Sequence, residues 1–182
     1  MDKDQEIALI RDCQQGDRKA LDTLVRHFEK PVYNAAYRML GNMDEAADVT
    51  QTAFMKLFEN INRFDQNYRL FSWIYRIALN EAINQLGRRR KLEPLEEPPY
   101  HDDRDELQDC LAASQLHTEI QAILMELHED HRTVIVLHYF TDCSYRHIGE
   151  ILDLPEKTVK SRLFTARQQL KNRLQQHGIF HA

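Results

Sequence analysis

The chain of 182 residues is long enough for one ordinary domain or two small ones, and its 42% apolar and 29% charged residues are typical of a globular protein. No run approaches the roughly 18 apolar residues that a membrane span needs. The acidic N-terminus also lacks the features of a signal peptide, so we expect a cytoplasmic protein. A net charge of −5, taken alone, argues against binding to nucleic acid.

The charge is distributed unevenly along the chain. Residues 1–92 carry 15 basic and 13 acidic side chains and residues 117–182 carry eight of each, whereas residues 93–116 carry one basic and eight acidic side chains. This acidic stretch holds three of the five prolines and cannot bury enough apolar surface to fold alone. We therefore predict two small helical domains, at 1–92 and 116–182, joined by a flexible acidic linker over 93–115.

The first domain is predicted to be helical throughout. Apolar residues recur at the i, i+3, i+4, i+7 spacing of amphipathic helices, and Gly, Asp and Pro residues separate the periodic stretches. Asp17 and Asp44 suit N-caps, and Pro31 suits the first position of a new helix. The predicted helices therefore begin near Asp17, Pro31, Asp44 and Leu70, and the last ends near Leu86, before Gly87 and a basic run.

A polar stripe marks the last of these helices. Four polar residues recur every fourth position and must share one face: Arg76, Asn80, Asn84 and Arg88. Aromatic residues gather near the start of the same helix, and aromatic, Asn and Arg side chains together suit a single-stranded nucleic-acid site, where bases stack and expose their edges. Phe71 and Trp73 are equally well explained as core residues, so Phe64 and Tyr68, in the preceding polar loop, are the better candidates.

The second domain contains the pattern of a helix-turn-helix. Ser144 can cap a short helix, Leu154 and Pro155 break it, and a long helix follows. From Pro155 to Arg173 there are six basic residues and one acidic residue. A basic run alone more often indicates a solvated helix, but the capped preceding helix and the proline break favour DNA binding.

One face of this long helix must be buried, which predicts the face that reads DNA. Val159, Leu163, Ala166 and Leu170 share the apolar face. Near the N-terminal end, where base edges are reached, the opposite face carries Glu156, Lys157, Lys160, Ser161 and Phe164. Arg162, Arg167 and Lys171 are better placed for phosphates.

Metal binding and catalysis find little support. Cys13, Cys110 and Cys143 lie far apart, match no metal-binding spacing and are interpreted as free thiols. His128 and His131 have a spacing usable on a helix, but nothing completes a four-ligand site. Because the chain also lacks a phosphate loop and a nucleophile elbow, we expect no metal, no cofactor and no enzymatic activity.

The chain resembles extracytoplasmic-function sigma factors of the bacterial sigma-70 family over nearly its whole length. The first domain is similar to sigma region 2 in the stretches GDRKALDTLVRHF, VYNAAYRMLGN, DEAADVTQTAFMKLF and RFDQNYRLFSWIYRIALNEAINQLGRRR. The second is similar to sigma region 4 in LHEDHRTVIVLHYFTDCSYRHIGEILDLPEKTVKSRL and ARQQL. The chain departs from the usual patterns at Thr52, at His128, at the His147-Ile148-Gly149 that replaces Glu-Ile-Ala, and at Glu156-Lys157.

The resemblance implies a subunit that binds core RNA polymerase, directs it to promoters and opens them. The loop from Asn62 to Arg69 would hold a flipped base of the minus-10 element, and the acidic linker would occupy the later path of nascent RNA. The implied minus-10 residues are Asn62, Arg63, Phe64, Tyr68, Trp73, Arg76, Asn80, Asn84 and Arg88. The implied minus-35 residues are Glu156, Lys157, Thr158, Lys160, Ser161, Arg162, Phe164, Arg167 and Lys171.

The resemblance also implies protein partners. Asp44, Asp48, Gln51 and Phe54 would lie at the surface that docks on the clamp helices of the largest polymerase subunit, and Arg132 would lie near the flap. An anti-sigma factor, in this family often membrane-anchored, would cover the same surfaces, and no stable homo-oligomer is expected. The alternative from another class is a dimeric helix-turn-helix repressor or activator, which explains the second domain but not the stripe in the first. An enzyme acting on nucleic acid is a more remote alternative.

Overall fold

The described part of the chain folds into helices. The computed structural model describes residues 3–65, 68–92 and 108–179, and within these ranges it contains no strand, which confirms the all-α prediction. The predicted acidic linker lies mostly outside the described residues. In chain order the helices are α1 (Lys3–Gln14), α2 (Arg18–Leu40), α3 (Met43–Asn60), η1 (Ile61–Arg63), α4 (Leu70–Leu92), α5 (Gln108–Met125), α6 (Glu129–Ile135), η2 (Val136–Phe140), α7 (Tyr145–Leu152) and α8 (Glu156–Gln176).

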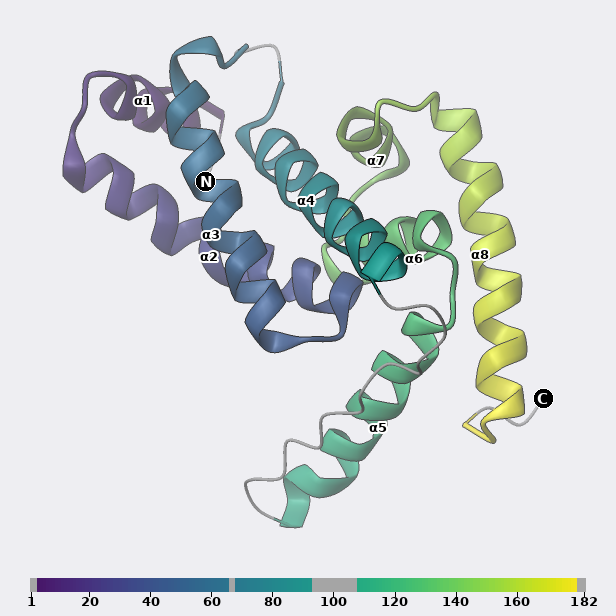
Figure 1. Cartoon of the computed structure of the whole chain (residues 1–182). Helices are drawn as coiled ribbons and strands as arrows, with labels where there is room; N and C mark the ends of the chain where they lie inside the picture. Colours follow the sequence, from purple (N-terminus) through teal and green to yellow (C-terminus); the bar gives the residue numbers. More distant parts are fainter. Residues whose placement is uncertain (1–2, 66–67, 93–107, 180–182) are drawn as a thin grey trace.

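The first half is a bundle of α2, α3 and α4 with α1 at one end (Figure 1). Its centre contains side chains that are fully excluded from solvent, including Leu24, Val32, Met39, Leu57 and Ile74. Asp17 caps α2 as predicted, because its carboxylate accepts a hydrogen bond from Lys19 N at 2.8 Å. The bundle therefore forms as its apolar periodicity predicts.

Helix α2 continues without interruption through Pro31, where we predicted the start of a new helix. A proline inside a helix removes one hydrogen bond and costs about 3 kcal/mol. Phe28 and Val32, on either side of it, are buried in the bundle core, and that packing outweighs the local cost. The predicted break at Pro31 was wrong because tertiary burial overrides the local signal.

Two further helix boundaries differ from the predictions. Helix α3 is capped by Asn42, whose side chain accepts from Glu45 N at 3.0 Å, and not by Asp44. Helix α4 continues through Gly87 to Leu92, although glycine disfavours a helix by about 1 kcal/mol. Leu86 is buried and Arg89 Nε donates to Glu45 Oε1 at 2.7 Å, so contacts with the bundle hold this extension.

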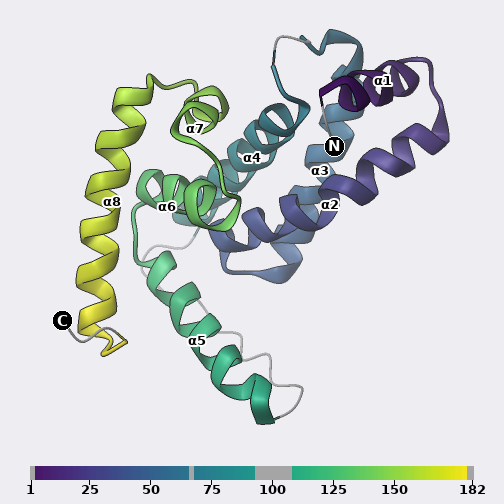
Figure 2. The same cartoon turned by 180° about the vertical axis from the view of Figure 1, so that it is seen from behind.

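The second half contains α5 to α8 and the predicted helix-turn-helix. Ser144 caps α7, since its hydroxyl accepts from His147 N at 3.2 Å, and α8 begins after Pro155 as predicted. Helix α5 begins at Gln108, inside the segment predicted as linker. Figures 1 and 2 place α8 at the opposite end of the molecule from α1.

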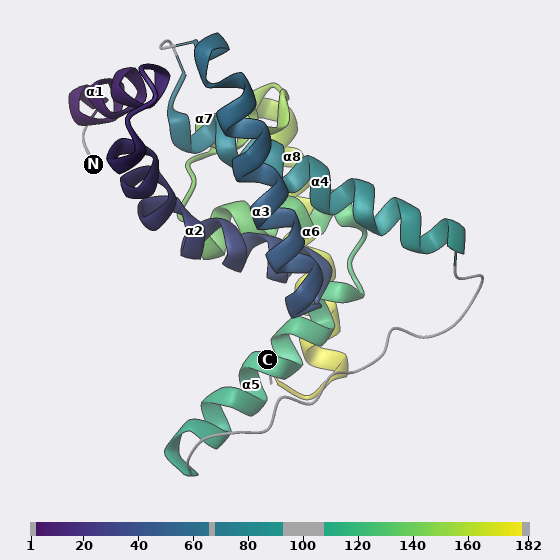
Figure 3. The ribbon, with the colours of Figure 1, turned by 60° about the vertical axis from the view of Figure 1, so that its left-hand side comes forward.

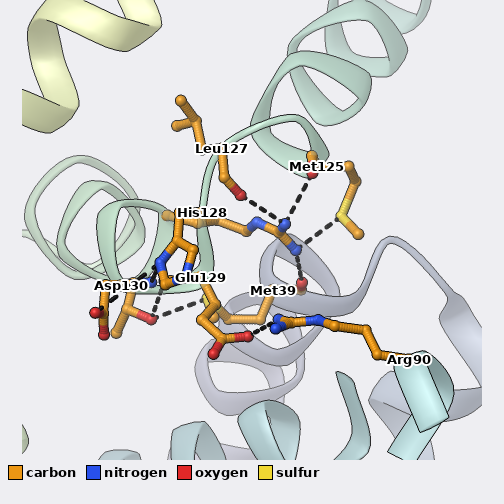
Figure 4. A network of polar contacts seen from close by, with 9 residues as sticks. Met39, Arg90, Met125, Leu127, His128, Glu129 and Asp130 are labelled. Atoms are coloured by element: carbon orange, nitrogen blue, oxygen red, sulfur yellow. Dashed lines mark hydrogen bonds and ion pairs between the residues drawn. The ribbon is translucent and has the colours of Figure 1, made fainter. Parts of the chain in front are cut away.

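The two halves pack against each other around a buried guanidinium group. Arg132 of α6 is 5% exposed and donates to the carbonyl oxygen of Met39 at the end of α2 and, at 2.9 Å, to those of Met125 and Leu127. Figure 4 shows these three carbonyl groups converging. Burial lowers the pKa of Arg132 to about 10, so the group still carries its charge at neutral pH. Arg132 thus joins α6 to α2.

Replacing Arg132 by methionine is expected to destabilise the protein. The substitution removes the donor shared by three carbonyl groups, and stranding buried polar groups of this kind costs about 3 kcal/mol. Urea unfolding followed by circular dichroism measures the loss. Arg146→Met is the matched control, because that side chain is 82% exposed and its ion pair with Glu150 spans one helical turn. A loss for Arg132→Met no larger than for the control would contradict this role.

Gly149 allows the close turn between α7 and α8. A Cβ atom at this position would lie 2.7 Å from the carbonyl oxygen of Leu154, which is too close for an unstrained contact. Glycine is therefore required here, even though it forms helices less readily than alanine. We expect Gly149→Ala to destabilise the protein even though alanine usually stabilises a helix. Gly87→Ala provides the opposite control, since nothing lies within 4 Å of its Cβ position and a gain of roughly 1 kcal/mol is expected. Thermal unfolding of both variants tests the contrast; stabilisation by both would contradict it.

Candidate nucleic-acid interface

A pocket lies where the loop after η1 enters α4. Its volume is about 170 Å³, which is below the roughly 300–1,000 Å³ of pockets for drug-sized ligands and favours a smaller group. It is lined by Arg63, Phe64, Asp65, Tyr68, Ser72, Trp73, Arg76 and Glu150. Five of the nine predicted minus-10 residues line this pocket, and α7 of the second half supplies one wall. The other four, Asn62, Asn80, Asn84 and Arg88, lie outside its lining.

The aromatic residues of this region divide into two groups. Phe64 and Trp73 pack with ring centroids 5.2 Å apart beside the pocket, and Tyr68 is 51% exposed at its edge. Phe71 instead packs on the buried Tyr75, with centroids 4.4 Å apart, and does not line the pocket. Of the two residues that were equally well explained as core, Trp73 joins the pocket and Phe71 does not.

Two pocket residues escaped the sequence reasoning. Ser72 is buried, and its hydroxyl has no hydrogen-bond partner among the described residues. A buried unsatisfied hydroxyl in a pocket wall is a feature that a ligand can explain. Ser72 lies four residues before Arg76, so the spacing of the polar stripe could have identified it. Glu150 comes from the second half, and no sequence pattern indicated that it reaches the pocket.

The polar stripe continues from this pocket along α4. Asn80, Asn84 and Arg88 are exposed, as the spacing predicts. Arg76 is half-buried and points at the second half, where its Nε donates to the carbonyl oxygen of Ile151 at 3.0 Å and its Nη2 to that of Glu150. In this arrangement, carbonyl groups of α7 therefore accept the hydrogen bonds of Arg76, which is the stripe residue nearest the pocket. On η1, Asn62 and Arg63 are exposed close by.

The second surface is the outer face of α8. Val159, Leu163 and Ala166 are buried and Leu170 is half-buried, so the predicted apolar face is confirmed. Arg162 and Arg167 are half-buried at its edge, and Arg162 pairs with Asp130 at 3.2 Å. The predicted base-reading residues and Lys171 are exposed in the structure: Glu156, Lys157, Thr158, Lys160, Ser161, Phe164 and Lys171.

Two tyrosines that the sequence reasoning missed hold a cation on this surface. Arg167 Nε donates to the hydroxyl of Tyr139 at 2.7 Å, and its Nη2 donates to that of Tyr145 at 3.3 Å. Lys160 pairs with Glu156 at 2.8 Å, and this contact raises the pKa of Lys160. Both cations therefore remain charged and partly oriented at neutral pH.

A groove between α2 and α3 contains two of the predicted polymerase-docking residues, Gln51 and Phe54. Asp44, Asp48 and Gln51 are exposed along α3, while Phe54 is 6% exposed and lies in the floor of the groove. The groove has a volume of about 740 Å³ and a mostly apolar lining. Residues that the sequence reasoning did not include complete it, among them Val25, Tyr33, Met55 and Phe58. Arg132, predicted near the polymerase flap, lies elsewhere, at the buried junction of the halves.

A second buried arginine also joins the halves. Arg38 of α2 donates to Gln121 Oε1 at 2.9 Å and to the ring of His117, both on α5, and its guanidinium lies 4.6 Å from the ring centroid of Phe140. Burial and the neighbouring guanidinium lower the pKa of His117, which favours the neutral ring that can accept this bond.

Cysteine and histidine side chains show no metal centre in the described part of the chain. Cys13 and Cys143 are buried free thiols, and burial raises the pKa of each to about 11. The side chain of Cys110 lies outside the described residues. The ring of His128 caps α6, and His131 contacts Gln169. Among the described helices, none is both long and apolar enough to cross a membrane.

Family comparisons match both halves. The sigma-70 region 2 family model matches residues 24–92, and the sigma-70 region 4 model matches residues 117–170. The chain is 32% identical to the ECF RNA polymerase sigma factor SigW of Bacillus subtilis, over 91% of this chain and 94% of that protein. It is 30% identical to the ECF RNA polymerase sigma-E factor of Escherichia coli, over 92% of this chain and 93% of that protein.

Solved structures show the same fold at lower identity. CnrH, solved in complex with the cytosolic domain of CnrY, aligns with a TM-score of 0.73 at 23% identity, over 93% of this chain and 97% of the CnrH chain.

Together with the two family matches, the similarity to curated relatives over nearly the whole length excludes a dimeric repressor, which would not account for the first half. The chain belongs to the extracytoplasmic-function sigma factors of the sigma-70 family and is an alternative sigma factor that directs RNA polymerase to promoters.

Proposed function

We propose that this sigma factor divides promoter recognition between its two halves. Residues 1–92 act as region 2, which docks on the polymerase and captures the minus-10 element, and residues 116–182 act as region 4, which reads the minus-35 element. The acidic segment between them connects the two. The observation that carries the proposal is the pocket at the start of α4, where aromatic rings, a buried unpaired hydroxyl and a polar stripe meet.

Capture of the minus-10 element depends on this pocket. Unstacking a base costs a few kcal/mol, and stacking on an aromatic side chain returns about 1–3 kcal/mol per base. Phe64 and Trp73 offer such a surface, and the Ser72 hydroxyl can gain a partner when a base enters. Asn80, Asn84 and Arg88 would then follow the strand along α4, with Asn62 and Arg63 at the pocket entrance. The energy of opening thus comes from trapping unstacked bases, and the protein acts as a specificity subunit rather than as a catalyst.

Reading of the minus-35 element depends on α8. Its N-terminal residues enter the major groove in a helix-turn-helix, while flanking cations contact phosphates. Lys160 and Ser161 are exposed at that end, and the two tyrosines orient Arg167 toward a fixed position. We assign base contacts to Glu156, Lys157, Thr158, Lys160, Ser161 and Phe164, and phosphate contacts to Arg162, Arg167 and Lys171.

Docking on polymerase would use the apolar groove between α2 and α3 together with the acidic residues that are exposed along α3. Asp44, Asp48 and Gln51 would contact the clamp helices of the largest subunit, and Phe54 would form the apolar floor. Because the protein would act by binding RNA polymerase, we propose that it is located in the cytoplasm. The sigma factor RpoE of Bartonella quintana was solved in complex with an anti-sigma factor, and we propose that an anti-sigma factor also regulates this chain.

We further propose that the free chain binds promoter DNA weakly because its halves cover each other. Arg76 of the stripe is bonded to α7, and Glu150 forms one wall of the base pocket. A ligand that needs a minor open form binds with its affinity reduced by the open fraction. Polymerase would favour the open form by holding region 2 and region 4 apart, and Arg132 would become available to the flap only in that form.

In vitro transcription with sigma-free core polymerase tests the division of roles. The wild-type chain is expected to produce discrete new RNA 5′ ends on fragments of the source genome. Asn80→Ala should lower open-complex formation by about tenfold while leaving minus-35 duplex binding unchanged, and Lys160→Ala should weaken minus-35 binding by roughly tenfold. Lys19→Ala, at an exposed position of α2 outside both surfaces, is the control. If neither site variant differs from Lys19→Ala, the residue assignments are wrong.

Weakening the contact between the halves should increase the DNA affinity of the free chain. Arg38→Ala removes bonds to α5 without altering a proposed DNA residue. If the closed form dominates, we expect the affinity for a single-stranded minus-10 oligonucleotide to rise about tenfold, as measured by fluorescence anisotropy without polymerase. A gain cannot result from damage to the fold. Arg26→Ala, exposed on the same helix, should have no effect; unchanged affinity for both variants would contradict the closed form.

A further inference from the structure

Helix α1 contacts both ends of the segment that carries the base pocket. At one end, Gln14 Nε2 donates to the carbonyl oxygen of Ile61 at 2.9 Å. At the other end, the carboxylate of Glu6 accepts from the backbone N–H of Leu70 and from Arg69 Nε, the latter at 3.0 Å. Figure 3 shows α1 beside the end of α3 and the chain that leads into α4. The pocket residues Phe64, Asp65 and Tyr68 lie between these two contacts along the chain.

The start of α4 requires an acceptor from elsewhere. Arg69 precedes the helix, and its carbonyl oxygen accepts from Trp73 N at 3.2 Å. An arginine side chain has no acceptor with which to cap a helix, and its positive charge is unfavourable beside the positive end of the helix dipole. Glu6 supplies both the missing acceptor and a negative charge. Its two carboxylate oxygens bond to different partners on the two sides of the helix start.

The burial of Glu6 makes this arrangement specific. The side chain is 3% exposed, and a carboxylate is buried to this extent only where hydrogen bonds and an opposite charge compensate it. Ile10 and Cys13 of the same helix are buried in the apolar core, so α1 also has apolar contacts with the bundle. The charged group beneath the entrance of α4 adds hydrogen bonds that apolar packing does not provide.

We propose that Glu6 and Gln14 are positioning residues for capture of the minus-10 base, fixing the backbone at Ile61 and at Leu70 so that the pocket walls are in place before DNA arrives. The inference rests on the proposed minus-10 function of that pocket. A pre-formed site avoids the entropic cost of ordering a loop during binding. The region 2 family match begins at residue 24, so it assigns no role to α1.

The test uses the full chain bound to core polymerase, with a single-stranded non-template minus-10 oligonucleotide as the probe. Loss of the charge-assisted bonds of Glu6 predicts a drop of about tenfold in affinity for Glu6→Ala, and loss of the neutral bond of Gln14 predicts a drop of roughly threefold for Gln14→Ala. Glu6→Gln should lie between wild type and Glu6→Ala, because its amide oxygen can still accept from Leu70 N. Asp4→Ala, an exposed acid in the same first turn, is the matched control. Affinities for core polymerase and for a minus-35 duplex should stay unchanged in every variant.

A spectroscopic readout separates positioning from general folding. Trp73 is the only tryptophan of the chain and lines the pocket, so its fluorescence reports on the loop. In the free chain, Glu6→Ala should increase quenching of Trp73 by acrylamide while the far-ultraviolet circular dichroism stays as in wild type. If Glu6→Ala does not fold, the test depends on Gln14→Ala alone. This variant should fold, because Ile61 O still accepts a hydrogen bond from Phe64 N at 3.2 Å and is not left without a partner.

Asn80→Ala serves as the reference for the site itself. If Asn80→Ala impairs capture while folded Glu6→Ala and Gln14→Ala do not, the positioning role is wrong and the minus-10 site stands. If all three leave capture unchanged, the site assignment is wrong and the inference fails with it. Equal losses on the minus-10 probe and the minus-35 duplex would indicate general damage to the fold and would also overturn the positioning role.

Discussion

The burial of one face of α4 is the constraint on which the rest of the structure depends. Ile74, Ala78 and Ala82 are almost fully excluded from solvent against the bundle, so the helix cannot rotate about its axis. That fixed orientation directs the stripe from Ser72 to Arg88 away from α2 and α3. The same helix therefore contributes to the core on one side and presents a polar surface on the other, and its start forms a wall of the pocket.

Local sequence signals predicted the helix boundaries correctly where the capping residue and the burial of the helix indicate the same boundary. Asp17 and Ser144 cap helices because their side chains reach nearby backbone N–H groups, and these contacts depend only on neighbouring residues. Pro31 and Gly87 misled the prediction because distant parts of the bundle stabilise the helix through them. The junction of the halves could not be predicted from the sequence, since Arg132 bonds to backbone carbonyls, which carry no sequence signal.

The candidate site shows the same division. Helical spacing predicted the exposed stripe and the exposed face of α8, since both follow from which side of each helix is apolar. Spacing gave no sign of Glu6, Tyr139 or Glu150, because each acts across a gap of many residues in the sequence. Sequence patterns thus predict which face of each helix is exposed, whereas the groups that orient the side chains on that face emerge only from the packed structure.

The two arrangements proposed for Arg76 share one chemical requirement. A guanidinium group needs acceptors, and in the closed form the C-terminal carbonyl groups of α7 supply them. A DNA strand along α4 would supply phosphate or base acceptors to the same donors. Acceptors on the DNA would thus replace the bonds that Arg76 loses when α7 moves away, which lowers the net cost of opening once DNA is bound. The bonds from Arg38 to α5 and from Arg132 to Met39 O cross the junction and would be lost on opening, so they would set how far the equilibrium lies toward the closed form.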